Sequence, residues 1–207
     1  MAIKEIIKAV TEPATNIVNP PTRSVGAFFG ATLDFWFSNR MKKYAEKQIM
    51  DELALRKFRE ECEAEFAKIP EEERVPPRKS LFLSALDAAE YYVEEEELRR
   101  MFARLIAATC DMRKASKVHP SFAGIIQQLS PLDAQNLVNL SSHSEMLFEP
   151  FGPFRFFEET ETETVCLQRQ SWSCLYSLGL VTTLKSSYTF TVHGKIFCEI
   201  CLPEDKP

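Results

Sequence analysis

The feature that most constrains the fold is a run of apolar residues at helical spacing that follows a proline-rich segment ending at Pro77. Phe82, Leu86, Ala89 and Val93 recur every three or four residues, which places them on one face of a helix. A face of this kind is stable only when other helices cover it. We therefore predict four helices that form one continuous core, over residues 81–92, 95–112, 120–129 and 131–142. The side chains expected to be buried in it are Leu86, Phe102, Leu105, Ile106, Ile125, Ile126 and Leu137.

The N-terminal part, residues 1–76, has a different character. Residues 22–37 predict an amphipathic helix whose aromatic side chains cover more than half of its circumference. Residues 39–68 are rich in Glu, Lys, Arg and Ala, and predict one long, largely solvated helix that ends at Pro70. An acidic and proline-containing linker over residues 71–77 then separates this part from a helical core over residues 77–129.

The C-terminal part, residues 130–207, predicts a small α/β unit. An acidic loop over residues 158–164 precedes a helix over residues 165–178, which Gly179 ends. Two short β-prone runs, residues 180–184 and 188–192, then flank Lys185, Ser186 and Ser187, as expected for a hairpin, and a short amphipathic helix follows. This order is similar to the wing region of winged-helix domains. The predicted fold class is therefore mainly α, a helical bundle with a small winged-helix-like C-terminal module.

Composition limits the partners. The net charge of −5 at pH 7 gathers after Ser130, which makes nucleic acid an unlikely ligand for the C-terminal module. The six cysteines follow no signal peptide, so we expect free thiols in a cytoplasmic protein. Cys198 and Cys201 form the one C-x-x-C pair, and without a second ligand pair at suitable spacing we expect no metal and no cofactor.

Candidate catalytic residues are few. The sequence contains no phosphate-binding loop, no nucleophile elbow and no zinc-protease motif. Arg113 and His119 fit the loose Arg-x(4–6)-His pattern of helical ribonucleases of the HEPN class, in which the arginine stabilises phosphate charge and the histidine acts as general acid or base. Pro120 places His119 at the start of a helix, where the histidine would instead cap or be buried. The weight of these observations is against an enzyme.

The helix over residues 22–37 has too short an apolar run for a bilayer, which needs about twenty residues. It could lie in a membrane interface, with nearby lysines and Arg40 at the headgroups, or pack in an oligomer or in the core. We expect a partner, another copy of the chain or a peripheral membrane contact, to cover its aromatic face. The contact residues on this face are Phe28, Phe29, Leu33, Trp36 and Phe37.

Two strings carry a family resemblance. Residues 96–107, Glu-Glu-Leu-Arg-Arg-Met-Phe-Ala-Arg-Leu-Ile-Ala, and residues 119–134, which contain His-Pro-Ser-Phe and Leu-Ser-Pro-Leu-Asp-Ala, resemble the Abi-alpha family of abortive-infection proteins, otherwise described as a domain of unknown function. The resemblance implies bacterial defence against phage and brings no established catalytic residues. We expect an oligomeric interaction or sensing module that binds a phage or host protein. A membrane-perturbing effector and a HEPN-like ribonuclease remain the alternatives.

Overall fold

The structure, a computed structural model, describes residues 22–47, 52–142, 163–184 and 187–203. Within them the chain is mainly helical, with one small antiparallel sheet near the C-terminal end. The helices are α2 (Thr22–Lys47), α3 (Glu52–Ala67), the 3-10 helix η1 (Glu71–Glu73), α4 (Lys79–Ala89), α5 (Glu96–Ala108), α6 (Ser121–Ile126), α7 (Pro131–Ser142), α8 (Glu163–Ser177) and α9 (Val192–Cys201). The strands are β1 (Val181–Leu184) and β2 (Ser187–Phe190).

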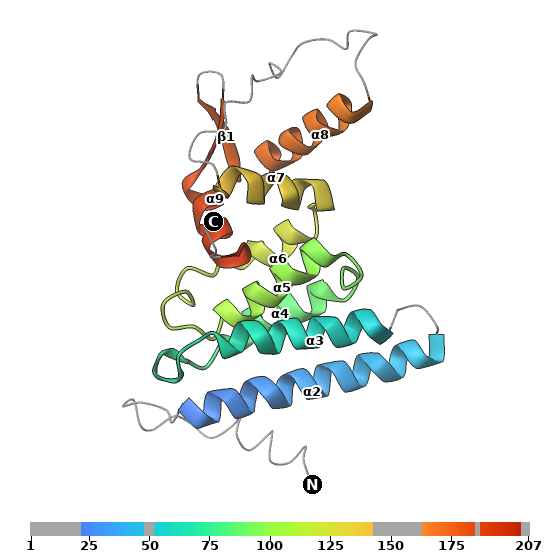
Figure 1. The fold of residues 1–207 in the computed structure, drawn as a ribbon. Helices are drawn as coiled ribbons and strands as arrows, with labels where there is room; N and C mark the ends of the chain where they lie inside the picture. Colours follow the sequence, from blue (N-terminus) through green and yellow to red (C-terminus); the bar gives the residue numbers. More distant parts are fainter. Residues whose placement is uncertain (1–21, 48–51, 143–162, 185–186, 204–207) are drawn as a thin grey trace.

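The helices form successive layers (Figure 1). α2 is the outermost layer and α3 turns back along it, while α4 and α5 lie on the other side of α3. α5 also contacts α6, α7 and α9, so it occupies the middle of the molecule. A single cluster of buried apolar side chains runs from Val25 to Leu202 and joins residues of all three predicted segments.

The predicted core is confirmed. All seven side chains expected to be buried are at most 6% exposed, and Phe102, Ile106, Ile126, Leu86 and Leu137 are fully buried. Phe122 from α6 and Phe197 from α9 meet edge to face in the same core, with ring centroids 5.3 Å apart. The helical periodicity of residues 79–142 therefore identified both the helices and their inward faces.

The prediction for the N-terminal helices needs two corrections. α2 continues to Lys47 instead of ending at residue 37, because no proline or glycine interrupts the chain there, and Arg40 anchors the added turns through Glu90 at 2.8 Å. The second helix is also not largely solvated, since Leu55, Phe58 and Cys62 of α3 are at most 1% exposed. α3 is a core helix that lies between α2 and α5, and its charged residues, such as Arg59 and Glu61, are at least partly exposed.

The segment predicted as a linker is fixed to the end of α5. The N–H of Val75 donates to the carbonyl of Cys110 at 2.9 Å, and the N–H of Met112 donates to the carbonyl of Glu73 at 2.8 Å. Arg74 and Asp111 thereby form an isolated antiparallel bridge. The chain after α3 is held beside the turn that follows α5, which brings the charged residues of both segments together.

The C-terminal hairpin is present. β1 pairs with β2 in antiparallel register from Val181 opposite Phe190 to Leu184 opposite Ser187, and Gly179 has φ 70, as expected for a residue that ends a helix. The Thr191 side chain caps α9 by accepting from the N–H of Gly194 at 2.8 Å. The turn at residues 185 and 186 lies outside the described residues, as does the predicted acidic loop apart from residues 163 and 164, which begin α8.

Candidate functional site

The two residues that the sequence offered as a ribonuclease pair have different partners and line different cavities. Arg113 lies in the turn after α5, where Asp111 accepts from its guanidinium at 3.0 and 2.8 Å and Glu73 lies 2.6 Å from its Nε. His119 precedes α6 and lines a different cavity of about 340 Å³, beside Val118 and Ala123. Its Nδ1 accepts the backbone N–H of Ser121 at 3.2 Å, which is the capping role expected of a histidine before a helix. Arg113 and His119 share no described cavity.

The aromatic face of α2 is covered by the same chain. Leu33, Trp36 and Phe37 are at most 5% exposed, and Phe29 stacks on Phe66 of α3 with ring centroids 4.1 Å apart. Phe28 is half-buried, with its ring centroid 6.0 Å from that of Phe82. The sequence assigned this face to a second copy or a membrane because the other apolar faces of the chain were expected to be used in its own core, and residues 39–68 were expected to be solvated. Since α3 is a core helix, its own phenylalanines make the contact.

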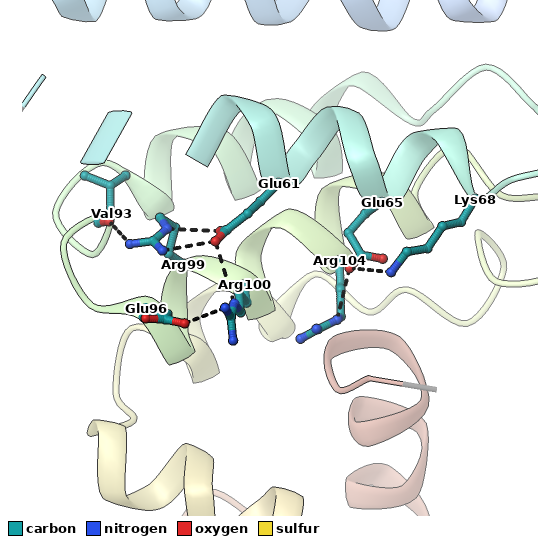
Figure 2. A network of polar contacts seen from close by, with 8 residues as sticks. All are labelled: Glu61, Glu65, Lys68, Val93, Glu96, Arg99, Arg100 and Arg104. Carbon is teal, nitrogen blue, oxygen red and sulfur yellow. Dashed lines mark hydrogen bonds and ion pairs between the residues drawn. The ribbon is translucent and has the colours of Figure 1, made fainter. Parts of the chain in front are cut away.

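A row of ion pairs joins α3 and α5 (Figure 2). Glu61 and Glu65 lie one turn apart on α3, opposite Arg99, Arg100 and Arg104 on α5. The residue numbers rise together along both helices, so α3 and α5 run in the same direction. We call these five residues the ion-pair row.

Arg99 forms the strongest contact of the row. Its Nε and Nη2 donate to the two carboxylate oxygens of Glu61, each at 3.0 Å, while Nη1 donates to the carbonyl of Val93 at 3.0 Å. The Arg99 side chain is only 7% exposed. A buried guanidinium with all three nitrogens bonded has a structural role, because it fixes α5 and the preceding turn to α3.

Arg104, at the other end of the row, is only partly compensated. Its Nε lies 3.4 Å from Glu65, and that carboxylate also accepts from Lys68 at 3.0 Å. Burial lowers the pKa of Arg104 from its ordinary value, Glu65 offsets part of this effect, and the positive charge of Arg100 adds to it. The structure gives the two Nη groups no hydrogen-bond partner among the described residues.

Two cavities meet at Arg104. The smaller, of about 230 Å³, lies where α3, α5 and α9 end, and Lys68, Asp111 and Lys114 line it. The larger, of about 440 Å³, lies between α5 and α7, with Arg100 and Glu97 at its charged side and Met101 and Val138 among its apolar residues. Leu202 and Pro203 line both cavities. Arg104 is therefore a cation at the junction of two hollows in a protein of net charge −5.

Three thiols, those of Cys110, Cys198 and Cys201, are poor candidates for covalent chemistry. Burial raises the pKa of Cys110 and of Cys198 to about 12, and raises the pKa of Cys201 well above its ordinary value. A thiol with such a pKa stays protonated near neutral pH and is a weak nucleophile. Within the described ranges, no three His, Cys, Asp or Glu side chains gather where they could hold a metal ion.

The ion-pair row was not predicted from the sequence. The arginines were visible at the spacing 99, 100 and 104, as were glutamates one turn apart at 61 and 65. Those glutamates were assigned to a solvated helix, and nothing local marks their pairing with residues 38 positions away. The available signal was that Glu61 and Glu65 stand next to apolar residues at helical spacing, such as Cys62 and Phe66, which are buried in α3.

No helix in the described part of the chain has the length and hydropathy that crossing a bilayer requires. A comparison with curated proteins finds no match, and a comparison with solved structures finds none either. The sequence model of the abortive infection alpha family matches residues 50–172, more than half of the chain, and this segment contains α3 to α7 and the whole ion-pair row. The protein is therefore a member of the abortive infection alpha family.

Proposed function

We propose that this protein takes part in abortive-infection defence against phage as a sensing module, and that the site around Arg104 receives the signal. The observation that carries the proposal is the position of Arg104, a poorly compensated cation at the junction of two cavities within the family-matched segment. A partly buried guanidinium whose Nη groups have no acceptor among the described residues favours a ligand that supplies acceptors.

The arrangement of helices around the site supports a sensing role. The larger cavity is formed by α5, α7 and the residues after α9, so one ligand there would contact the centre of the molecule and its C-terminal end together. A ligand that binds only one arrangement of these elements shifts the population toward that arrangement.

The outer face of α8 is the surface we propose for a protein partner. Leu167 and Tyr176 are 49% and 54% exposed, and Gln170 and Ser173 between them are exposed neutral residues. The order α7, α8, hairpin, α9 supports a winged-helix-like module as a proposal. In such a module α8 would be the recognition helix, yet this face lacks the several cations that phosphate contacts need, which favours a protein over nucleic acid.

A phage challenge tests the proposal. Cells that express Arg104→Gln should lose protection, measured as plaquing efficiency and survival. Arg59→Gln, which removes an exposed arginine paired with Glu63 and with Asp34 of α2, should protect like the wild type. Equal protection by both variants, at equal protein levels, would contradict a signal site at Arg104.

The same cultures separate the two alternative functions. RNA integrity and membrane potential are followed during infection, and His119→Ala is added as a third variant. If RNA is degraded in infected wild-type cells but stays intact with His119→Ala, and this variant also loses protection, the ribonuclease is favoured. Early loss of membrane potential that Phe35→Ser abolishes would favour an effector that acts on membranes through the outward face of α2, where Phe35 is 57% exposed.

A further inference from the structure

We propose that the larger cavity, between α5, α7 and Leu202, binds a small organic phosphate monoester through Arg104 and Arg100. This inference rests on the proposed function, since it names the chemical class of the signal. Three properties of the site lead to it: the charge balance along α5, the chemistry of the cavity walls and its size.

The charge balance leaves room for an anion. Arg100 and Arg104 are one turn apart on the same face of α5, and both line the larger cavity. Arg100 pairs with Glu96 on α5 itself, and the carboxylates of α3 are shared: Glu61 is bound by Arg99 at 3.0 Å and lies 3.7 Å from Arg100, while Glu65 pairs with both Lys68 and Arg104. Four cations, Arg99, Arg100, Arg104 and Lys68, thus share three carboxylates, Glu61, Glu65 and Glu96. A dianion between Arg100 and Arg104 would relieve the repulsion between the two guanidinium groups.

The chemistry of the donors favours phosphate. Arginine presents a planar fork that matches phosphate and carboxylate oxygens in pairs, and two forks one turn apart suit a group that carries two negative charges. Glu97, the acidic residue of this cavity, is already held at 3.0 Å by Gln135 of α7. Its carboxylate is thus directed toward α7 and does not satisfy Arg104.

The remaining walls favour an organic ligand over a bare ion. Met101, Ala134, Val138, Leu202 and Pro203 give the cavity an apolar side, next to the arginines. Its volume of about 440 Å³ falls in the range of about 300–1,000 Å³ that is usual for small-molecule sites. A phosphate at Arg104 would leave space for an apolar or ring-shaped portion against Met101 and Val138.

A structural role for Arg104 makes a different prediction. α3, α5 and α9 all end at the smaller cavity, and helix C-termini carry partial negative charge that attracts cations. If Arg104 only compensated these helix ends, then removing it would lower stability, and phosphate compounds would not bind at saturable sites.

The test is binding to the full chain by calorimetry, with thermal unfolding followed in parallel. The probes are inorganic phosphate, ribose 5-phosphate, adenosine monophosphate and adenosine, at constant ionic strength. We expect saturable binding of at least one monoester with a Kd below about 1 mM, weaker binding of inorganic phosphate, and none of adenosine. Arg104→Gln should weaken monoester binding at least tenfold and Arg100→Gln severalfold, while Arg59→Gln should bind like the wild type.

A second variant blocks the cavity independently, in case Arg104→Gln loses binding only because it fails to fold. Val138→Trp would fill the cavity from the α7 side without changing its charge, and it should also abolish monoester binding if the monoester occupies this cavity. Failure of both monoesters to bind the wild type, or equal binding of adenosine, would overturn the inference. Monoester binding that survives in folded Arg104→Gln would do so as well.

Comparison with the phage assay tells the two proposals apart. If Arg104→Gln abolishes protection and no monoester binds the wild type, the ligand class is wrong and the signal site remains. If a monoester binds through Arg104 and Arg104→Gln still protects cells, the binding site is right and its role in sensing is wrong.

Discussion

Arg99 shows how much depends on a single buried charge. Its side chain is 7% exposed and its three nitrogens are bonded to Glu61 and to the carbonyl of Val93. Removing one partner of a buried pair leaves the other charge without compensation, which is far more destabilising than losing an exposed pair. Arg100, next in the chain, is 53% exposed and offers a comparison on the same helix.

We expect Arg99→Ala to lower the free energy of unfolding by about 3–5 kcal/mol. Arg100→Ala should lower it by at most about 1 kcal/mol, because exposed pairs contribute little. Urea denaturation of the two variants and the wild type measures both effects. Equal midpoints for the two variants would contradict the structural role of Arg99.

Asp111 should make the free energy of unfolding depend on pH in the acidic range. Burial by itself would raise the pKa of Asp111, but the hydrogen bonds from the side chain and backbone of Arg113 outweigh it and hold the pKa below its ordinary value. The carboxylate is 4% exposed and accepts from Arg113, two residues later in the turn after α5. Because the folded pKa lies below the unfolded one, ionised Asp111 stabilises the fold above the unfolded pKa of about 3.9.

This stabilisation should disappear as the pH falls through the folded pKa. We expect the free energy of unfolding to decline on acidification below about pH 5, and Asp111→Asn to decline less steeply over the same interval. Unfolding midpoints measured from neutral pH downward give the slope of stability against pH for the wild type and for Asp111→Asn. Because slopes are compared, the lower starting stability of the variant does not affect the result. Parallel curves would show that Asp111 contributes nothing to the acid dependence.

For helices and strands, the sequence could predict what depends on residues close together in the chain, and could not predict what depends on residues far apart. α7 begins at Pro131 because Ser130 and Asp133 cap it reciprocally, with the Ser130 N–H at 2.7 Å from Asp133 Oδ2, and this signal is local. The α2–α3 pair and the ion-pair row depend on contacts between distant residues, such as the stacking of Phe29 on Phe66 at 4.1 Å and the hydrogen bond from Arg99 to Glu61 at 3.0 Å. Periodicity identifies a buried face, but it does not say which element covers it.

α2 should respond differently to changes on its two faces. Trp36 is 5% exposed and Phe35, its neighbour, is 57% exposed. We expect Trp36→Ser to destabilise the protein by about 3 kcal/mol or more, and Phe35→Ser to change stability by less than about 0.5 kcal/mol. Denaturation measures stability, and light scattering shows whether Phe35→Ser dissociates an oligomer. A larger loss for Phe35→Ser would mean that α2 packs with the opposite face.

The start of α9 depends on a glycine. A Cβ built on Gly194 would overlap the backbone carbonyl of Leu180, so α9 and the residue just before β1 approach each other too closely for any side chain. Gly194→Ala should therefore lower the unfolding free energy by about 1–3 kcal/mol. Gly124→Ala in α6 is the matched control, since nothing lies near its Cβ, and it should be neutral or stabilise by about 0.5–1 kcal/mol. Unfolding midpoints that move in the same direction would contradict this packing.

For the whole molecule, the position of α5 is the main organising fact. It contacts α3, α4, α6, α7 and α9, so no neighbour can leave without exposing part of its surface. α2 lies at the outside, and among the described helices it packs chiefly on α3 (Figure 1). The family-matched segment starts at residue 50, after α2. The fold thus has a central helix, α5, which other helices surround, and an outer helix, α2, which packs on the rest of the described chain through one face.

This layering should be visible in the rate at which backbone amides exchange with deuterated solvent. Amide protons of α5 should exchange only when the entire chain unfolds, so their protection should equal the global free energy of unfolding. Those of α2 should exchange faster, through openings that detach the outer helix while α5 stays protected. Mass spectrometry of peptides from the two helices would measure this difference, and equal protection would mean that α2 and α5 open in a single step. If α2 does detach first, the aromatic face that it buries becomes accessible for short periods in an otherwise folded protein.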